Sequence, residues 1–300
     1  MKINYQGTDK ERLDKYLIQH LGISRSQIKK IILDGQVSVN ERLASVHHWL
    51  KPGDKIDYAQ LKAAKPADFP ALPKIVEKTD EFLIIEKPHN LLTHPTDKKE
   101  TNTLADWLIQ EFPQTKKIGD DPTRPAIVHR LDKEVSGLMV IPLTQASFDN
   151  LKNQFQDRTI TKEYTALVHG QMINESGEVN TPLERDKKTG LMKVQSDKYL
   201  DKPAITIYQV VKKLINYTLL KVQIKTGRMH QIRAHFYSIG HSVVGDKLYQ
   251  TKDIRKKKKV LEQRIFLHAS YLKFKDLAGN NREYNSKLPG LLQDFLNKAK

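Results

Sequence analysis

Helical spacing of apolar residues marks two short stretches near the start of the chain. Residues 13–21 carry leucine at every fourth position, and residues 28–32 place three isoleucines on one side. This spacing is typical of short amphipathic helices that pack against each other or against a small sheet. The pattern therefore predicts a compact unit that begins with two helices.

Capping signals bound these two helices. Thr8 and Glu11 have the spacing of a capping box before the first helix, and Ser24 and Gln27 repeat that spacing before the second. Gly35 follows the second helix, where a glycine is favoured because it can adopt the left-handed conformation. We expect the second helix to stop there.

Two extended pieces, 36–39 and 55–58, follow the helices, and Pro52-Gly53 predicts a turn before the second piece. The first unit is thus expected to be a small helix–helix–strand–strand module over residues 1–61. Residues 62–74 carry three prolines among lysines and alanines, which is typical of a semi-rigid linker.

The remaining domain, residues 75–300, mixes strands and helices without regular alternation. The expected strands are 82–86, 138–143, 162–169, 217–225 and 271–275, and the expected helices are 103–112, 145–157 and 228–239. Regular alternation would indicate a doubly wound parallel sheet. We therefore expect an α+β fold with a mixed, largely antiparallel sheet.

Net charge narrows the class of partner. The chain of 300 residues has a formal net charge of +16, which favours nucleic acid first and an anionic membrane surface second. No apolar run approaches the ~20 residues of a membrane span, and the first residues lack the apolar core of a secretory signal. The chain has no cysteine, which excludes disulfides, thiol nucleophiles and thiolate metal sites. We expect a cytoplasmic protein.

Basic residues gather at two places. Arg25 and Lys29 are four residues apart on the second helix and share a face, with Lys30 beside them. Charge alone favours an ordinary solvated face over a phosphate-binding one. The run of lysines at 256–259 is open to both interpretations, a solvated loop or an RNA contact.

Three segments carry candidate chemistry. His129-Arg130-Leu131-Asp132 precedes a predicted strand, and a carboxylate beside basic groups is a plausible nucleophile. Tyr164, in the segment KEYTALV, offers a ring for stacking on a base. Taken alone, the first segment is more typical of a turn with a salt bridge, and the tyrosine is more typical of a core residue.

The third segment is KTGRMHQIRAH, with Arg228, His230 and Arg233 near the start of a predicted helix. An arginine there can pair with a carboxylate or a phosphate. We reject a metal site because the histidines are scattered, and a Ser136-based catalytic triad because no nucleophile elbow surrounds the serine.

Together these segments carry two resemblances. Residues 10–58, including RLDKYLIQHLGISRSQIKKIILDGQVSVN, resemble the S-four-like (alpha-L) RNA-binding module, although Glu41 stands where a glycine is usual. The ordered segments HRLDKEVSG, KEYTALV and TGRMHQIRAH, with GHSVVGDKLY and FLHA after them, resemble the RluA/RluD family of RNA pseudouridine synthases. Val135 departs from the threonine that many members of that family have.

The family resemblance implies a role for each matching residue. Asp132 is the expected catalytic residue, Tyr164 packs against the target base, and Arg233 pairs with the aspartate. Leu267 lines the pocket, and Arg130 fills the space that the flipped base leaves. Contacts to RNA are expected from Arg228 and His230 and, in the module, from Arg25, Lys29 and Lys30.

The implied activity is the isomerisation of specific uridines in structured RNA, with ribosomal RNA of the large subunit expected and transfer RNA as the alternative. No cofactor, metal or membrane is implied, and we expect a monomer. Two other classes stay open at this point. A ribosome-associated RNA-binding protein without chemistry would fit the charge and the module equally well. A nuclease would need a metal-binding cluster of acidic residues, which the sequence lacks.

Overall fold

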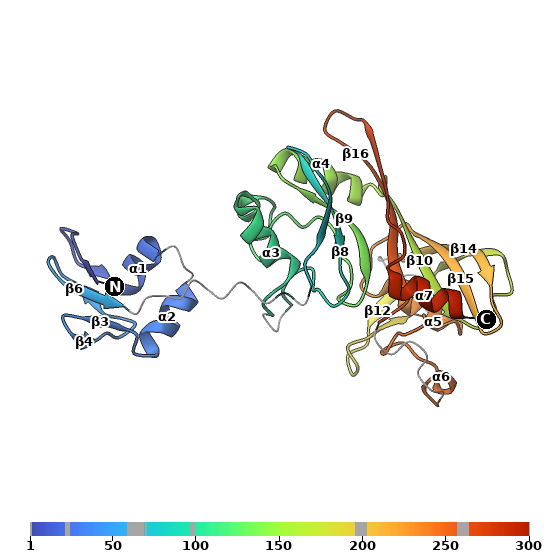
Figure 1. The fold of residues 1–300 in the computed structure, drawn as a ribbon, viewed down its shortest axis with the longest axis horizontal. Helices are drawn as coiled ribbons and strands as arrows, with labels where there is room; N and C mark the ends of the chain where they lie inside the picture. Colours follow the sequence, from blue (N-terminus) through green and yellow to red (C-terminus); the bar gives the residue numbers. More distant parts are fainter. Residues whose placement is uncertain are drawn as a thin grey trace. The chain divides into compact units, whose positions relative to one another are not determined.

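The computed structural model describes residues 2–21, 25–58, 69, 71–96, 100–195, 203–256 and 264–299 (Figure 1). The chain divides into two compact units, Met1–Asp68 and Phe69–Lys300, which are described separately. Most of the expected linker lies outside the described residues, and so do Lys257–Lys259 of the lysine run. The expected domain bounds, 1–61, 62–74 and 75–300, stay a prediction.

The described residues of the first unit form two helices and six short strands. They are β1 (Lys2–Asn4), β2 (Glu11–Arg12), α1 (Leu13–Leu21), α2 (Arg25–Leu33), β3 (Val37–Val39), β4 (Arg42–Leu43), β5 (Trp49–Leu50) and β6 (Lys55–Tyr58). Four strands form a sheet in the order β1-β6-β3-β4, and β2 pairs with β5. Leu13 and Leu17 of α1 and Ile28 and Ile32 of α2 are buried in one core with Ile56 of β6. The expected helical stripes therefore form the core of this unit.

The ends of the two helices differ in how well the sequence predicts them. The capping box expected at Thr8 and Glu11 is wrong, because Glu11 pairs with Leu50 in an extended segment and α1 begins only at Leu13. The second expected box includes Ser24, which lies outside the described residues. Gly35 does stop α2: its φ is +69°, and its amide donates to the carbonyl of Ile32 at 3.1 Å.

The second unit contains a nine-stranded sheet and several helices. Its elements are β7 (Lys74–Lys78), β8 (Phe82–Lys87), α3 (Leu104–Glu111), η1 (Pro113–Lys117), β9 (Ser136–Pro142), α4 (Gln145–Gln156), β10 (Thr161–His169), β11 (Ser176–Asn180), β12 (Leu183–Arg185), β13 (Met192–Val194), β14 (Ile205–Lys213), β15 (Tyr217–Ile224), α5 (Gln231–Ser238), α6 (Lys252–Lys256), β16 (Leu267–Lys275), β17 (Asn281–Asn285) and α7 (Gly290–Lys298).

The large sheet has the order β11-β14-β15-β10-β16-β9-β8-β7, with β17 paired to β16. Its strand pairs are antiparallel except for β9 and β16, which run parallel. The prediction of an α+β fold with a mixed, largely antiparallel sheet is confirmed. The expected helix 228–239 is shorter than predicted, because His230 has a φ of +51° and α5 begins at Gln231.

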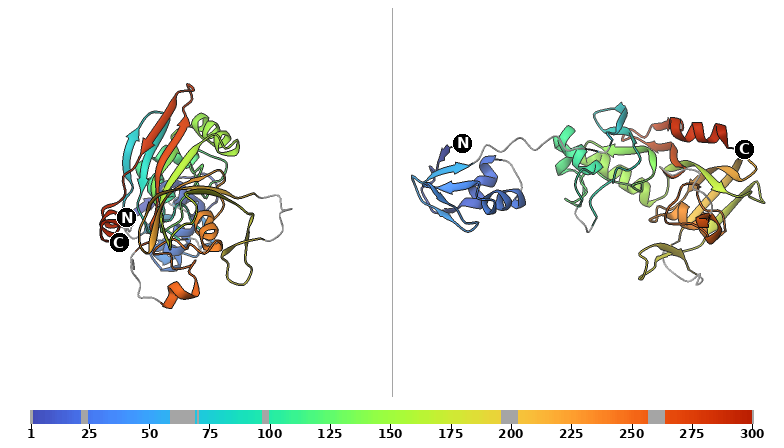
Figure 2. Two further views of the ribbon diagram at one scale, coloured as in Figure 1. Left: turned by 90° about the vertical axis from the view of Figure 1, so that its right-hand side faces the viewer. Right: turned by 60° about the horizontal axis from the view of Figure 1, so that its bottom comes forward.

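Helices cover both faces of this sheet (Figure 2). On β10, Ala166 and Val168 face the main core, which receives Ile232 and Phe236 from α5 and also residues of α3. Leu167 lies between them in sequence and faces the opposite side, where it packs with Leu292 of α7. Helix α5 and helix α7 therefore lie on opposite faces.

The parallel pair of β9 and β16 depends on Gly137. This residue has a φ of +127°, and a Cβ atom built on it would lie 2.3 Å from the carbonyl oxygen of Ala269. Only glycine allows the two backbones to approach this closely. The approach brings Ser136, the first residue of β9, opposite His268, which follows Leu267 at the start of β16.

Among the described residues, no helix has both the length and the apolar character needed to cross a lipid bilayer.

Candidate active site

A small cleft collects the predicted chemistry of the second unit. Its volume is about 60 Å³, and its walls come from the loop before β9, from β10, from the segment leading into α5 and from the start of β16. Every site residue that the sequence predicts in this unit lines the cleft, namely Arg130, Asp132, Tyr164, Arg228, His230, Arg233 and Leu267. Segments more than one hundred residues apart in sequence thus meet at one place.

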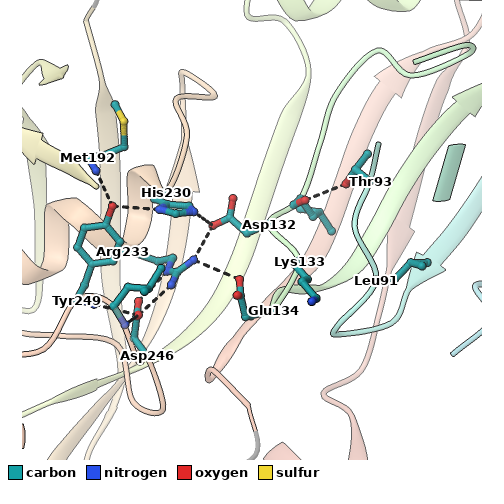
Figure 3. A network of polar contacts seen from close by, with 12 residues as sticks. Leu91, Thr93, Asp132, Lys133, Glu134, Met192, His230, Arg233, Asp246 and Tyr249 are labelled. Carbon is teal, nitrogen blue, oxygen red and sulfur yellow. Dashed lines mark hydrogen bonds and ion pairs between the residues drawn. The ribbon is translucent and has the colours of Figure 1, made fainter. Parts of the chain in front are cut away.

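Arg233 lies at the back of this cleft with its side chain 2% exposed. Its Nη1 donates to Asp132 Oδ2 at 3.2 Å, and the same nitrogen lies 3.5 Å from Glu134 Oε2 (Figure 3). Its Nε and Nη2 donate to the two carboxylate oxygens of Asp246 at 2.7 and 2.9 Å. Burial lowers the pKa of Arg233, but the facing carboxylates of Asp246, Asp132 and Glu134 outweigh burial and raise it above its usual value.

Asp132 lies in the loop before β9 with its side chain 15% exposed. Hydrogen bonds to the backbone carbonyls of the two neighbouring residues, Leu131 and Lys133, hold this loop in place. Thr93 Oγ1 donates to the carbonyl of Leu131 at 2.8 Å, and Lys87 Nζ lies 3.4 Å from the carbonyl of Lys133. The Asp132 carboxylate therefore reaches the cleft from a backbone that is fixed on both sides.

His230, the residue directly before α5, approaches the same carboxylate. Its Nε2 lies 4.0 Å from Asp132 Oδ2, and its Nδ1 lies 3.1 Å from the Tyr249 hydroxyl (Figure 3). Since that hydroxyl accepts the Met192 amide at 2.8 Å, its own proton is free to be donated to Nδ1. Burial lowers the pKa of His230, which favours the neutral ring. A neutral ring that accepts at Nδ1 carries its proton on Nε2, toward Asp132.

Tyr164 and Leu267 form apolar walls of the cleft. Both are buried, with exposed fractions of 6% and 3%. Burial, and next the charge of Asp132, raise the pKa of Tyr164 above its usual value, so its hydroxyl keeps its proton at neutral pH. These two side chains line the cleft from β10 and β16 of the sheet.

The arginines at the rim are less fixed. Arg130 is exposed, and its Nη1 lies 3.5 Å from His94 Nε2. Arg228 Nε donates a long hydrogen bond of 3.4 Å to the carbonyl of Pro203. In the first unit, Lys29 is exposed on α2, whereas the side chains of Arg25 and Lys30 lie outside the described residues.

Two residues of the site had no role assigned from the sequence. Asp246 is the main partner of Arg233, and Tyr249 holds His230 and stacks its ring 5.3 Å from the Arg233 guanidinium. Both belong to the run GHSVVGDKLY, which carries part of the family resemblance. The resemblance of that run to the family could have pointed to these two residues. The spacing of the run does not indicate that Asp246 pairs with Arg233.

Metal and triad chemistry find no support among the described residues. No group of three or more His, Asp or Glu side chains in that part of the chain could hold a metal ion. Ser136 bonds neither His129 nor His230, since its Oγ lies 2.8 Å from His268 Nδ1 and accepts from Arg264 Nη2. The carboxylates of Asp132, Glu134 and Asp246 face Arg233 instead.

Known proteins are similar to this chain in both units. Residues 81–238 match the family model described as RNA pseudouridylate synthase, and residues 11–56 match the S4 domain model. An uncharacterized RNA pseudouridine synthase of Aquifex aeolicus is 37% identical over 264 residues, covering 84% of this chain and 81% of its own length. The ribosomal large subunit pseudouridine synthase D of Yersinia pestis is 32% identical, and the match covers 97% of this chain and 91% of that protein. The solved structure of human RNA Pseudouridylate Synthase Domain Containing 1 superposes with a TM-score of 0.58 at 26% identity, covering 73% of this chain and 84% of that one.

Proposed function

Since this chain belongs to the RNA pseudouridylate synthase family, an isomerase family, we propose that it converts specific uridines of large-subunit ribosomal RNA to pseudouridine with Asp132 as the nucleophile. The choice of RNA rests on the relative from Yersinia pestis, whose name gives the large ribosomal subunit, and on the S4 domain. The proposal includes action as a monomer in the cytoplasm.

The contact between Asp132 and Arg233 carries the proposal. The reaction breaks the bond between N1 of uracil and carbon 1 of ribose and forms a bond from carbon 5 to the same sugar carbon. Carbon 5 then loses its proton and N1 takes up a proton, so the product is an isomer of the substrate. A carboxylate can attack either the base or the sugar and be displaced again. Arg233, at 3.2 Å, orients the Asp132 carboxylate and offsets its charge.

The other residues of the cleft would hold the base while it is detached. Tyr164 supplies a flat wall for the uracil ring, and Leu267 supplies an apolar wall that excludes water. The target base must first leave its stack, which costs a few kcal/mol. Arg130, exposed at the rim, is placed to fill the space that the base vacates. Contacts of the S4 domain and the basic surface with RNA would offset the cost.

The experiment uses an unmodified transcript of large-subunit ribosomal RNA incubated with the purified protein, after which pseudouridines are mapped along the transcript. The proposal predicts conversion at a small number of positions. A transfer RNA mixture, treated in parallel, tests the alternative substrate. If the protein binds the ribosomal transcript but converts no uridine in either RNA, a binding protein without chemistry becomes the better account.

A further inference from the structure

A second and larger cavity adjoins the Asp132 cleft. Its volume is about 390 Å³, within the range of cavities that hold small molecules. It shares Arg130, Tyr164 and Arg228 with the cleft, so Tyr164 lines both spaces. We call this second cavity the basic pocket.

The charge of the basic pocket is of one sign. Besides the shared arginines, its lining includes Arg124, Arg158, Lys162 and Lys225, and none of the described residues that line it is Asp or Glu. Arg124 is partly neutralised by Asp121, at 3.0 Å from its Nε. A concave surface that combines several cations with no lining carboxylate attracts anions strongly.

Lys162 is the strongest sign that this pocket is built for an anion. Its neighbour Glu163 pairs with Lys221 at 2.8 Å, whereas no carboxylate among the described residues lies within ion-pair distance of Lys162. Burial lowers the pKa of Lys162 to about 8, so the amine still carries its charge at neutral pH. Keeping a partly buried cation without a counterion costs free energy, which a bound anion would recover.

The floor of the pocket is aromatic and neutral. The Phe155 ring lies 5.1 Å from Lys162 Nζ and stacks on His129, with centroids 4.7 Å apart. Burial lowers the pKa of His129 to about 3, and its Nε2 accepts the Val140 amide at 3.1 Å. This histidine is therefore uncharged. The pocket thus pairs flat apolar side chains with cations, which is the combination that holds a nucleotide.

We propose that the basic pocket binds a phosphate of the RNA strand, with its nucleotide, directly next to the uridine held in the Asp132 cleft. The inference rests on the proposed function for the identity of the strand. The shared wall of Arg130 and Tyr164 is the reason for this occupant, because a strand whose base enters the cleft continues along that wall into the pocket. Lys162 and Arg158 contact the phosphate, and the base of that nucleotide packs on the aromatic floor formed by Phe155 and His129.

The test compares binding of uridine 3′,5′-bisphosphate with binding of uridine by calorimetric titration at pH 7. Wild type should bind the bisphosphate about tenfold or more tightly than the nucleoside. Lys162→Met keeps the packing of the side chain on Phe155 but removes the charge. Arg158→Gln changes an exposed side chain and leaves folding unaffected. Each variant should lose most of the preference for the bisphosphate.

Lys298→Met is the matched control, since Lys298 is exposed on α7, on the opposite face of the sheet from α5. It should retain the wild-type preference. The inference is overturned if wild type does not prefer the bisphosphate, or if Lys162→Met and Arg158→Gln both keep the full preference. Pseudouridine formation by wild type is measured separately, so a failure of the proposed activity is distinguishable from a failure of the pocket.

Discussion

Arg233 and Asp246 form a buried ion pair with two hydrogen bonds, at 2.7 and 2.9 Å, while the bond from Arg233 to Asp132 is single and longer, at 3.2 Å. The side chain of Asp246 is fully buried, and it also accepts the amides of Leu248 and Tyr249. The guanidinium is therefore held from behind by Asp246, and one nitrogen is left to face Asp132. By fixing the guanidinium of Arg233, Asp246 determines where Asp132 and Arg233 meet.

Replacing Asp246 should therefore affect both stability and the site. Asp246→Asn removes the charge that pairs with a buried arginine, and breaking a buried pair costs about 3–5 kcal/mol of the free energy of unfolding. Urea denaturation measures this loss. Glu134→Gln is the control: its side chain is 43% exposed and 3.5 Å from the same arginine, so it should cost less than about 1 kcal/mol. Equal effects of the two substitutions would contradict this account.

His268 should make the protein sensitive to acid. Its Nδ1 lies 2.8 Å from Ser136 Oγ and its Nε2 lies 2.9 Å from Ser286 Oγ, which donates to Glu86. Burial, assisted by the charge of Arg264, lowers the pKa of His268 from 6.5 to about 4. Below pH 6.5 the unfolded chain therefore binds a proton that the folded one does not, and stability falls until pH reaches about 4.

For this one group, the loss of unfolding free energy between pH 7 and pH 5 is roughly 2 kcal/mol. His268→Gln removes the titrating group and should make the decrease in stability between these two pH values smaller by that amount. Urea denaturation at both pH values provides the measurement. His129, whose pKa burial lowers to about 3, remains in the variant and keeps its own share of the decrease. An unchanged decrease in the variant would show that His268 does not titrate in this way.

Gly137→Ala tests the close approach of β9 and β16. The added methyl would lie 2.3 Å from the Ala269 carbonyl oxygen, in addition to the strain of the positive φ. Gly279→Ala separates these two effects, because Gly279 has a φ of +82° and nothing within 4 Å of the added atom. We expect a cost of about 1–2 kcal/mol at Gly279, from strain alone. The cost at Gly137 should be clearly larger, and equal costs would argue against a steric role for this contact.

Local patterns predicted the parts of the fold that local interactions determine. The leucine and isoleucine stripes became the core of the first unit, and the strand predicted at 162–169 is β10, Thr161–His169. Strand β11, with the sequence SGEVN, was missed because it has a glycine and little β-branched character. It is extended because it pairs with β14, which no local pattern can indicate.

In the site, too, local motifs could be recognised from the sequence, whereas contacts between distant segments could not. The motif residues around Asp132 and Arg233 were identified from their segments, and the fold brings them to 3.2 Å. Asp246 was missed because its importance comes from a partner thirteen positions away whose direction is set by α5. The sequence could not single out Lys162, on which the proposed phosphate site depends, because a lysine on an amphipathic strand looks solvent-exposed until Phe155 and the surrounding cations are in place.

Removing residues 1–61 should separate RNA binding from chemistry. Each unit has its own core, and every residue lining the Asp132 cleft belongs to the second unit. We therefore expect the truncated protein to fold, to bind the large-subunit transcript more weakly, and still to form pseudouridine at high protein concentration. Filter binding and pseudouridine mapping give the two readouts. A truncated protein that binds the transcript as tightly as the full chain would contradict the role assigned to the S4 domain.

The central claim is that Asp132 is the nucleophile. Asp132→Asn keeps the size of the side chain and removes its negative charge, and an amide is a far poorer nucleophile. The variant should fold and should bind the large-subunit transcript within about tenfold of wild type, which is ~1.4 kcal/mol. The most direct measurement is the release of tritium from carbon 5 of labelled uridine in that transcript. The account predicts release by wild type and none by Asp132→Asn, and near wild-type release by the variant would contradict it.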